Sequence, residues 1–257
     1  MMQKTVHHQK LCWYGVQANE NYWDAYWQQR IDRALSKARI PHAIKPLLNS
    51  LPPGAKVLEA GCGRGDKVKA LLNQGFQAEG VDSAQKTVEL LRGKGIPVSQ
   101  MDVRQLHFKD SIFDAYLSFG VIEHFFDEEE ARQTLREAIR VTKTGGRIFC
   151  SVPYTNKIRE NYFLAGTGQT LPAASSAFYQ RSYREDQLKD LFQGLPLRVI
   201  RIGYENPVKG ISDEVPALKW LRNPFVALPL NFIHDQTGFL NAYGHMIYFD
   251  MKNQKVG

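Results

Sequence analysis

The middle of the chain alternates between two hydrophobic periods, one typical of strands and the other typical of helices. Short apolar runs predict strands, whereas apolar residues that recur every three or four positions predict amphipathic helices. The helical period is clear at 66–73, at about 83–92 and after Asp127. The apolar runs predict seven strands, at 56–60, 77–81, 97–101, 112–119, 147–152, 197–202 and 245–251.

Strands that alternate with helices in this order predict an α/β fold, in which a parallel sheet carries helices on both faces. The last two predicted strands have no helical pattern of the usual length between them, so we expect the last strand to run antiparallel. The sheet belongs to a domain at 51–257, which follows a segment at 1–50 that the sheet does not use.

Several residues mark where the predicted helices begin and end. Ser83 is placed to cap the second helix, and the acidic run that starts at Asp127 favours a helix N-terminus through the helix dipole. The glycine pair at 145–146 is expected to end that helix. Ser182 and Glu185 have the spacing of a capping box, which predicts a further helix there.

A glycine-rich loop, GCGRG at 61–65, separates the first strand from the first helix. Glycine lets a ligand approach the backbone closely, although a tight turn between strand and helix would also use it. The GxGxG spacing differs from the GxGxxG that places a pyrophosphate on a helix N-terminus. Three carboxylates lie at or just after the ends of the first three strands. Glu59 could engage a cationic amine, Asp82 could accept from both ribose hydroxyls, and Asp102 could accept from an adenine amino group.

Five segments, in order, resemble the class I S-adenosylmethionine-dependent methyltransferases: VLEAGCGRG, GVDSAQ, MDV, FDAYLSFGVIEHF and TGGRIFCSVPY. The resemblance covers about residues 20–152 well. It implies a Rossmann-like doubly wound sheet, S-adenosyl-L-methionine as methyl donor and S-adenosyl-L-homocysteine as product. It also implies a donor site, formed by Trp23, Glu59, Gly61, Cys62, Gly63, Gly65, Asp82, Ser83, Asp102, Val103 and Phe119.

The residues after the fourth strand bear on the reaction. The [DN]PP[YF] signature of nucleic-acid and protein-amide N-methylation is not found there, and VIEHF instead resembles the small-molecule branch, including quinone O-methyltransferases and related C-methyltransferases. In that branch the EH pair faces the acceptor. His124 is therefore the candidate general base, and Glu123 could orient it or bind the acceptor. Alternatively, His124 is a structural residue of the loop before Asp127.

Three segments lie outside the sheet pattern: 1–50 and two insertions at about 153–181 and 204–243. They hold 17 of the 29 aromatic residues and all four tryptophans, so we expect folded structure rather than disorder. By resemblance, the first segment is a helical lid over the donor, although a plain packing helix fits the pattern equally well. The insertions are expected to build the acceptor pocket, and the candidate acceptor residues are Tyr22, Tyr154, Arg159, Tyr179 and His234.

The apolar segment at 220–233 is interrupted by Pro224 and Pro229 and is too short to span a bilayer. It could cover an apolar pocket or contact a membrane surface, so peripheral membrane contact is a further expectation.

Composition excludes several classes of protein. A hydrophobic content of 43% argues against disorder, and three cysteines without CxxC spacing argue against a disulfide scaffold. The N-terminus lacks the apolar stretch of a signal peptide, so we expect a cytoplasmic protein. Neither HExxH nor paired Cys/His spacing is found, so we expect no metal site.

The formal charge of +7 is unevenly distributed. Residues 51–150 carry 14 basic and 14 acidic side chains, so the whole excess lies outside the predicted donor domain. A charge-balanced domain argues weakly against a nucleic-acid partner and leaves room for an acceptor with an anionic group.

These features favour an S-adenosylmethionine-dependent methyltransferase that acts on a bulky apolar or aromatic small molecule, with O-methylation favoured. Two alternatives stay open. One is an RNA- or protein-modifying methyltransferase, and the other is a family member that binds the cofactor without turnover.

Overall fold

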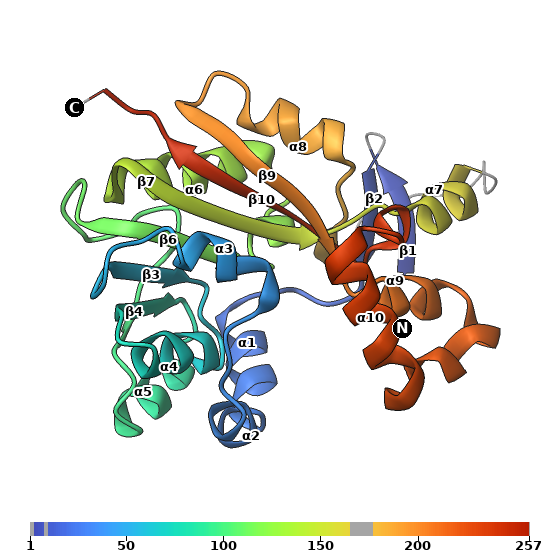
Figure 1. The fold of residues 1–257 in the computed structure, drawn as a ribbon, viewed down its shortest axis with the longest axis horizontal. Coiled ribbons are helices and arrows are strands. Elements are labelled where there is room, and N and C mark those ends of the chain that lie inside the picture. The colour runs from blue at the N-terminus through green and yellow to red at the C-terminus, as the bar shows by residue number, and fades with distance from the viewer. Residues whose placement is uncertain (1–2, 8–9, 165–176, 257) are drawn as a thin grey trace. The chain divides into compact units, whose positions relative to one another are not determined.

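The computed structural model describes residues 3–7, 10–164 and 177–256 (Figure 1). A seven-stranded sheet has the order β5-β4-β3-β6-β7-β10-β9, and the arrow of β10 points against that of β7 in Figure 1. The α/β fold with an antiparallel last strand is thus confirmed. The strands are β3 (Lys56–Ala60), β4 (Gln77–Asp82), β5 (Val98–Gln100), β6 (Phe113–Phe119), β7 (Thr142–Pro153), β9 (Leu197–Glu205) and β10 (Met246–Asn253).

The strand β3 lies between β4 and β6 and pairs with both in parallel. Its side chains Val57, Leu58 and Ala60 are fully buried, as expected for a strand covered on both faces. The register pairs Ala60 with Val81 of β4 and with Ser118 of β6. The carboxyl ends of these three strands therefore meet at one edge of the sheet, where ligands bind in open α/β sheets.

The helices of the predicted pattern are α4 (Asp66–Asn73), α5 (Gln85–Gly93), α6 (Glu128–Val141) and α8 (Glu185–Phe192). The cap at Asp127 is confirmed, because its carboxylate accepts a hydrogen bond from the Glu129 amide at 2.9 Å. The prediction for Ser83 was wrong, since the N-cap of α5 is Ala84 and carries no side-chain hydrogen bond of its own.

Two further helix-end predictions were wrong. The helix α6 ends at Val141 and the chain enters β7 directly, so the glycine pair at 145–146 lies inside β7. Gly146 is required there by close packing, because a Cβ atom would lie 2.9 Å from the Asp114 carbonyl oxygen. The helix α8 is capped by Arg184, whose amide donates to the Gln187 side chain at 3.0 Å, rather than by Ser182.

The chain divides into two compact units. We call Ala18–Cys150, Gly194–Arg201 and Phe249–Gly257 the core unit. We call Met1–Gln17, Ser151–Gln193 and Ile202–Tyr248 the insertion unit. The domain boundary predicted at residue 50 does not coincide with this division, because residues 1–50 contribute to both units.

In the core unit, the N-terminal segment supplies the helices α1 (Glu20–Gln28), α2 (Ile31–Ser36), η1 (His42–Ile44) and α3 (Lys45–Leu48). In the insertion unit, the same segment forms a hairpin of β1 (Gln3–His7) and β2 (Lys10–Tyr14). This hairpin pairs with β8 (Phe178–Arg181) in a three-stranded sheet. A wholly helical N-terminal segment is therefore wrong, because its first strands find a partner far along the chain.

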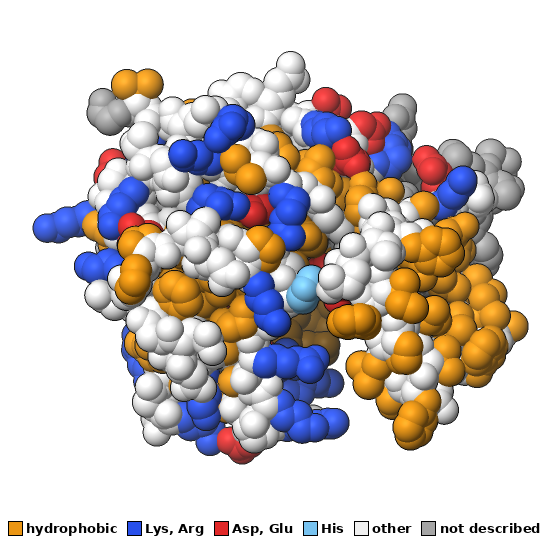
Figure 2. Space-filling view, viewed as in Figure 1, with side chains coloured by type: hydrophobic (Ala, Val, Ile, Leu, Met, Phe, Trp, Pro, Cys, Tyr) orange, Lys and Arg blue, Asp and Glu red, His pale blue; other side chains and the backbone are white. Residues whose placement is uncertain are grey.

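The insertion unit also contains α7 (Lys157–Leu164), α9 (Pro207–Glu214), η3 (Pro216–Arg222), α10 (Pro224–Thr237) and η4 (Asn241–Tyr243). The two prolines do not interrupt α10. Pro224 occupies the first turn, where its missing N–H costs nothing, and Pro229 lies inside the helix. In Figure 2 hydrophobic side chains gather on the surface over η3 and α10. Large apolar side chains of this segment are thus exposed, whereas those of an ordinary amphipathic helix are buried. No described helix is long and apolar enough to cross a membrane.

Candidate functional site

The glycine loop connects β3 to α4 in a backbone conformation that favours glycine. Gly61, Gly63 and Gly65 have φ of +73°, +47° and +68°. A Cβ atom at Gly61 would lie 2.4 Å from Val121 Cγ2, and one at Gly63 would lie 2.9 Å from the Trp27 ring. Neighbouring groups therefore approach this backbone too closely for any larger residue.

Glu59 is a fully buried carboxylate at the end of β3. Lys67 of α4 lies 3.1 Å from its Oε1 atom, while its Oε2 atom is buried and has no hydrogen-bond partner among the described residues. Burial raises the pKa of Glu59 to about 7, although Lys67 opposes the shift. The Lys67 ammonium also lies 4.8 Å from the centre of the Phe119 ring. An unsatisfied buried carboxylate oxygen is suited to a cationic ligand group.

Asp82 ties the glycine loop to the end of β4. Its Oδ2 atom accepts from the Gly63 amide at 2.8 Å, and its Oδ1 atom accepts from the Ala84 amide at 3.0 Å. Burial raises the pKa of this carboxyl, and the backbone hydrogen bonds act against that shift. Each oxygen keeps a second lone pair, so the carboxylate remains able to accept from ligand hydroxyls. Cys62 and Ser83 lie beside these groups in the chain, and the Cys62 thiol is buried.

Asp102 follows β5 and is held by Arg104. The guanidinium Nε lies 3.0 Å from Oδ1, and Nη2 lies 2.6 Å from Oδ2. Burial acts to raise the pKa of Asp102, but the hydrogen bonds and the charge of Arg104 outweigh it, so the pKa is lowered. The side chain of Val103 is buried beside it. This carboxylate is therefore ionised and oriented, and each of its oxygens accepts two hydrogen bonds from Arg104 in this state.

The helix α1 presents an aromatic face. Its N-cap Asn19 accepts from the Tyr22 amide at 3.0 Å. The rings of Trp23 and Trp27 are stacked with centroids 5.7 Å apart, and the Trp23 ring meets the His124 ring edge-on at 4.8 Å. Because Trp27 also approaches Gly63, this face covers the glycine loop and contacts the candidate base.

The position of α1 is fixed by Asp24. Its Oδ1 atom accepts from the Thr87 amide at 2.8 Å and from the Thr87 hydroxyl at 3.0 Å. Thr87 lies in the first turn of α5, whose amides would otherwise have no partner, so Asp24 caps α5 from another helix.

Glu123 and His124 lie in the short helix η2 (Ile122–His124). The Glu123 side chain is only 3% exposed, and its Oε2 atom has no hydrogen-bond partner. Burial raises the pKa of Glu123 to about 8, so this group is mostly protonated at pH 7. His124 Nε2 lies 4.0 Å from Glu123 Oε1, and the His124 side chain is 13% exposed. The Glu123 and His124 side chains can therefore hold a proton in a site that is largely shielded from water.

The candidate acceptor residues fall in both units. Tyr22 belongs to the core unit, where its ring meets that of Trp23 at 4.9 Å. In the insertion unit, the ring of Tyr154 lies 4.9 Å from that of Tyr204. Tyr179 packs against the buried Leu11 and Trp13.

Two of the candidates are engaged in the interior of the insertion unit. Arg159 is 3% exposed and forms an ion pair with Glu214 at 2.8 Å, and it donates to the Tyr154 carbonyl at 2.6 Å. His234 is buried, with Nε2 2.7 Å from the Tyr204 carbonyl oxygen. These contacts give Arg159 and His234 structural roles in this state of the protein.

Three residues of the site were missed by the sequence patterns: Asp24, Lys67 and Arg104. Lys67 had a usable signal, because it precedes the buried Ala70 and Leu71 by three and four positions and so shares their helix face. Asp24 and Arg104 had none, since their partners are set by tertiary contacts.

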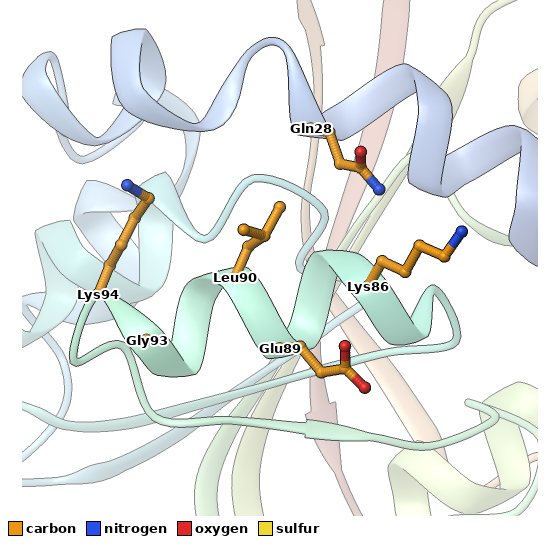
Figure 3. A pocket seen from close by; sticks show the side chains of 6 residues that line it. All are labelled: Gln28, Lys86, Glu89, Leu90, Gly93 and Lys94. Carbon is orange, nitrogen blue, oxygen red and sulfur yellow. The ribbon is translucent and has the colours of Figure 1, made fainter.

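A surface depression of the core unit lies apart from the candidate site. A depression of about 510 Å³ lies between α1 and α5 and is lined by Gln28, Lys86, Glu89, Leu90, Gly93 and Lys94 (Figure 3). Neither the loop glycines nor the site carboxylates line it. Among the described residues, no group of three or more His, Cys, Asp or Glu is arranged to hold a metal ion.

Known proteins resemble the chain over this same region. A family model described as a methyltransferase domain matches residues 58–150. The probable tRNA methyltransferase 9B of Mus musculus is 34% identical over 109 residues, which cover 42% of this chain and 24% of that protein. The ubiquinone biosynthesis O-methyltransferase of Xanthomonas oryzae pv. oryzae (strain PXO99A) is 30% identical over 152 residues, which cover 56% of this chain and 61% of that protein.

The chain thus spans about a quarter of the length of the tRNA methyltransferase relative. A solved structure extends the likeness to nearly the whole chain. It is titled as the complex between the Haloferax volcanii Trm112 methyltransferase activator and the putative methyltransferase. The matching chain is 17% identical with a TM-score of 0.59, and the match covers 95% of this chain and 99% of that chain. At this identity the likeness concerns the fold.

Proposed function

Because the chain contains a class I S-adenosylmethionine-dependent methyltransferase domain, we propose that it methylates a bulky apolar or aromatic small molecule, with oxygen the favoured acceptor atom. The observation that carries the proposal is the edge contact between the His124 and Trp23 rings, because it joins a candidate base to the aromatic face that covers the glycine loop.

The residues present fit the donor of this family. Glu59 offers a buried, unpartnered oxygen to the ammonium of the methionine end. Asp82, beside Ser83, offers a carboxylate for the ribose hydroxyls. Asp102, beside Val103, would accept from the adenine amino group in exchange for one of its hydrogen bonds from Arg104. Gly61, Cys62, Gly63 and Gly65 keep the loop backbone open to close approach, with Phe119 beside them, and Trp23 covers them from α1. When bound, S-adenosyl-L-methionine supplies an electrophilic methyl group on a sulfonium and leaves as S-adenosyl-L-homocysteine.

The protein's own contribution is orientation, exclusion of water and proton transfer. His124 accepts the proton of an acceptor hydroxyl at a ring nitrogen, because an oxygen acceptor must lose that proton as it is methylated. Glu123, mostly protonated at pH 7, binds the acceptor as a hydrogen-bond donor rather than as an anion. Tyr22 provides an aromatic surface for the acceptor beside Trp23. The other candidate acceptor residues, Tyr154, Tyr179, Arg159 and His234, belong to the insertion unit and make their contacts within it.

A small-molecule acceptor is favoured by where the cations of the core unit lie. Several of its arginines are paired with carboxylates, and each such pair reduces the positive charge that these side chains offer to a polyanion. The pairs are Arg104 with Asp102 and Glu130, Arg136 with Glu129, Arg140 with Glu137 and Asp110, and Arg147 with Asp250. The ubiquinone O-methyltransferase relative matches a longer part of this chain than the tRNA relative does.

Transfer RNA is the second candidate acceptor, and one observation favours it. The tRNA methyltransferase relative has the higher identity of the two, 34% against 30%. The match is confined to 42% of this chain, so it favours a shared donor domain and leaves the acceptor open.

The proposal is tested by calorimetry followed by turnover. We expect S-adenosylmethionine to bind with a micromolar Kd, and Glu59→Gln to weaken binding more than the matched change Glu20→Gln at the exposed start of α1. Turnover is then measured with labelled donor on a panel of hydroxylated aromatic molecules with apolar substituents. No micromolar binding by the folded protein would refute the proposal. Binding without turnover on any acceptor would leave a cofactor-binding protein instead.

A further inference from the structure

A second group of ionisable side chains, which the proposed reaction does not use, lies in the insertion unit. Its centre is the ring of His245, whose side chain is 16% exposed. Two basic side chains contact this ring: Arg159 Nη2 lies 3.1 Å from Nδ1, and Lys209 Nζ lies 2.9 Å from Nε2. Asp213 of α9 and Arg222 at the end of η3 lie beside them, and all five residues belong to the insertion unit.

The His245 ring is neutral. Burial lowers the pKa of His245 to about 2, and the neighbouring cations act in the same direction. A neutral imidazole has one ring nitrogen that donates a hydrogen bond and one that accepts it. The contacts at the two ring nitrogens must therefore be of opposite kinds.

Arg159 decides which of the two nitrogens accepts. A guanidinium remains charged and carries only donors, so Arg159 can only donate to Nδ1. The guanidinium is itself fixed, with Nε 2.8 Å from Glu214 and Nη1 2.6 Å from the Tyr154 carbonyl oxygen. Asp213 Oδ2 makes the longer contact with the same ring nitrogen, at 3.4 Å. With Nδ1 as the acceptor, the proton of the ring lies on Nε2.

This tautomer has a consequence for Lys209. The Nε2–H group of His245 faces the Lys209 nitrogen at 2.9 Å, and an ammonium has no lone pair with which to accept a hydrogen bond. The contact is therefore satisfied when Lys209 is a neutral amine. Burial of the amino group lowers the pKa of Lys209; Asp213 opposes this shift, and the charges of Arg159 and Arg222 add to it. The geometry and the surroundings thus favour the same form of the side chain.

Lys209 is also accessible. It is an exposed residue of α9, whereas its neighbours Val208 and Gly210 are buried. A neutral and accessible lysine amine is a nucleophile, and lysines that react with carbonyl compounds are activated by desolvation or by a neighbouring cation. Both conditions are met at this position.

We propose that Lys209 is a nucleophilic lysine that forms a Schiff base with an aldehyde. The amine nitrogen adds to the carbonyl carbon, a proton passes from nitrogen to oxygen, and the resulting carbinolamine loses water to give an imine. The step consumes one amine and one carbonyl group, releases one water and needs no oxidant or reductant. His245 is a positioning residue here, because its Nε2–H group holds the amine in its neutral form.

This inference goes beyond the proposed function, because it gives the insertion unit a covalent site that needs no methyl donor. The test is labelling of the full chain with benzaldehyde and sodium cyanoborohydride, which reduces the imine to a stable amine. Peptide mass spectrometry then measures the rate at each lysine. An ordinary lysine is almost entirely protonated at pH 7, so a lowered pKa increases the fraction that can react.

The matched control is Lys219, an exposed lysine of the same unit. At pH 7 we expect Lys209 to be labelled about tenfold faster than Lys219, since each unit by which a pKa falls raises the amine fraction about tenfold. The two rates should converge as the pH rises.

Two substitutions should change the rate at Lys209 in opposite directions. Asp213→Asn removes the anion that favours the ammonium, so labelling at pH 7 should rise about threefold. Arg222→Gln removes a cation and releases Asp213 from its ion pair, so labelling should fall about threefold. Circular dichroism checks that both variants are folded.

The tautomer of His245 is read independently by NMR. Long-range proton–nitrogen spectra of the histidine rings should place the proton on Nε2 at pH 7. A proton on Nδ1 would overturn the proposal, as would labelling of Lys209 no faster than Lys219 or a rate that neither substitution changes. None of these measurements involves methyl transfer, so their outcome is independent of the proposed reaction.

Discussion

At the scale of single residues, the site combines two buried carboxyl groups whose surroundings differ. Glu59 has Lys67 at 3.1 Å, whereas among the described residues no Lys or Arg forms an ion pair with the Glu123 carboxyl, and its neighbour is the His124 ring at 4.0 Å. Burial raises both pKa values, to about 7 and about 8. The Glu59 carboxyl can thus be ionised when a cationic ligand binds, while the Glu123 carboxyl stays protonated at pH 7.

The role of His124 is testable by substitution. We expect His124→Gln and His124→Ala to lower kcat about 10²- to 10⁴-fold, the usual contribution of a general base, while the Kd for S-adenosylmethionine stays within about twofold. The measurement is kcat and KM beside calorimetry, and the control is His107→Ala, an exposed histidine remote from the site. If both variants turn over normally, His124 only packs against Trp23.

The raised pKa of Glu59 predicts a pH dependence of donor binding. Below pH 7 the carboxyl is increasingly protonated and loses the charge that attracts an ammonium, so affinity falls as pH falls. With a pKa of about 7, the ionised fraction and the affinity should drop about fivefold between pH 7 and pH 6. Calorimetry at both pH values checks this. Glu59→Gln should flatten the profile, and a flat profile in the parent protein would contradict the assignment.

At the scale of elements, the position of α1 depends on a hydrogen bond to another helix. Asp24 serves as the cap that α5 lacks, and this fixes the orientation in which Trp23 and Trp27 face the glycine loop. The helix α1 is therefore anchored by one carboxylate, and its aromatic residues Trp23 and Trp27 face the site.

Removing this cap should destabilise the core unit. We expect Asp24→Ala to lower the free energy of unfolding by about 1–2 kcal/mol, the usual cost of losing a helix cap. Asp32→Ala is the matched control, because Asp32 forms an exposed ion pair with Lys94, also between the N-terminal segment and α5. Such surface pairs contribute little, so its effect should stay below about 0.5 kcal/mol. Urea unfolding measures both, and equal effects would show that Asp24 is not a cap.

At the scale of the whole molecule, the distribution of charge separates the two candidate acceptors. The formal charge of +7 first suggests a polyanion. Ion pairs of the core unit neutralise part of this charge, so the net charge alone does not assign a polyanion as the acceptor.

A binding and methylation assay with tRNA tests whether a polyanion is the acceptor. We expect bulk tRNA to bind only at low salt, with affinity falling steeply as salt rises, and to take up no methyl group from labelled donor. Fluorescence anisotropy across a salt series and counts in precipitated tRNA measure the two effects. Methyl incorporation into tRNA would replace the small-molecule acceptor and leave the assignment to methyltransferases intact.

The strands and the donor loop were predictable because their signals are local. A buried parallel strand such as β3 must be apolar along its length, and a loop with φ above zero at 61, 63 and 65 must carry glycine. The helix ends were less predictable. Gly146 and Ser182 look like a helix stop and a cap, but packing against Asp114 and a cap at Arg184 decided otherwise.

The sequence by itself determined the order of strands and helices, the donor loop and the carboxylates that follow three strands. These depend on periodicity and backbone conformation, which each short segment carries within itself. Only the tertiary structure decided that Lys67 pairs with Glu59, that Asp24 caps α5, that Arg159 is committed to Glu214, and that the outer side of α10 is exposed. Asp24 and Thr87 are 63 positions apart, and a contact over that distance leaves no pattern in either segment.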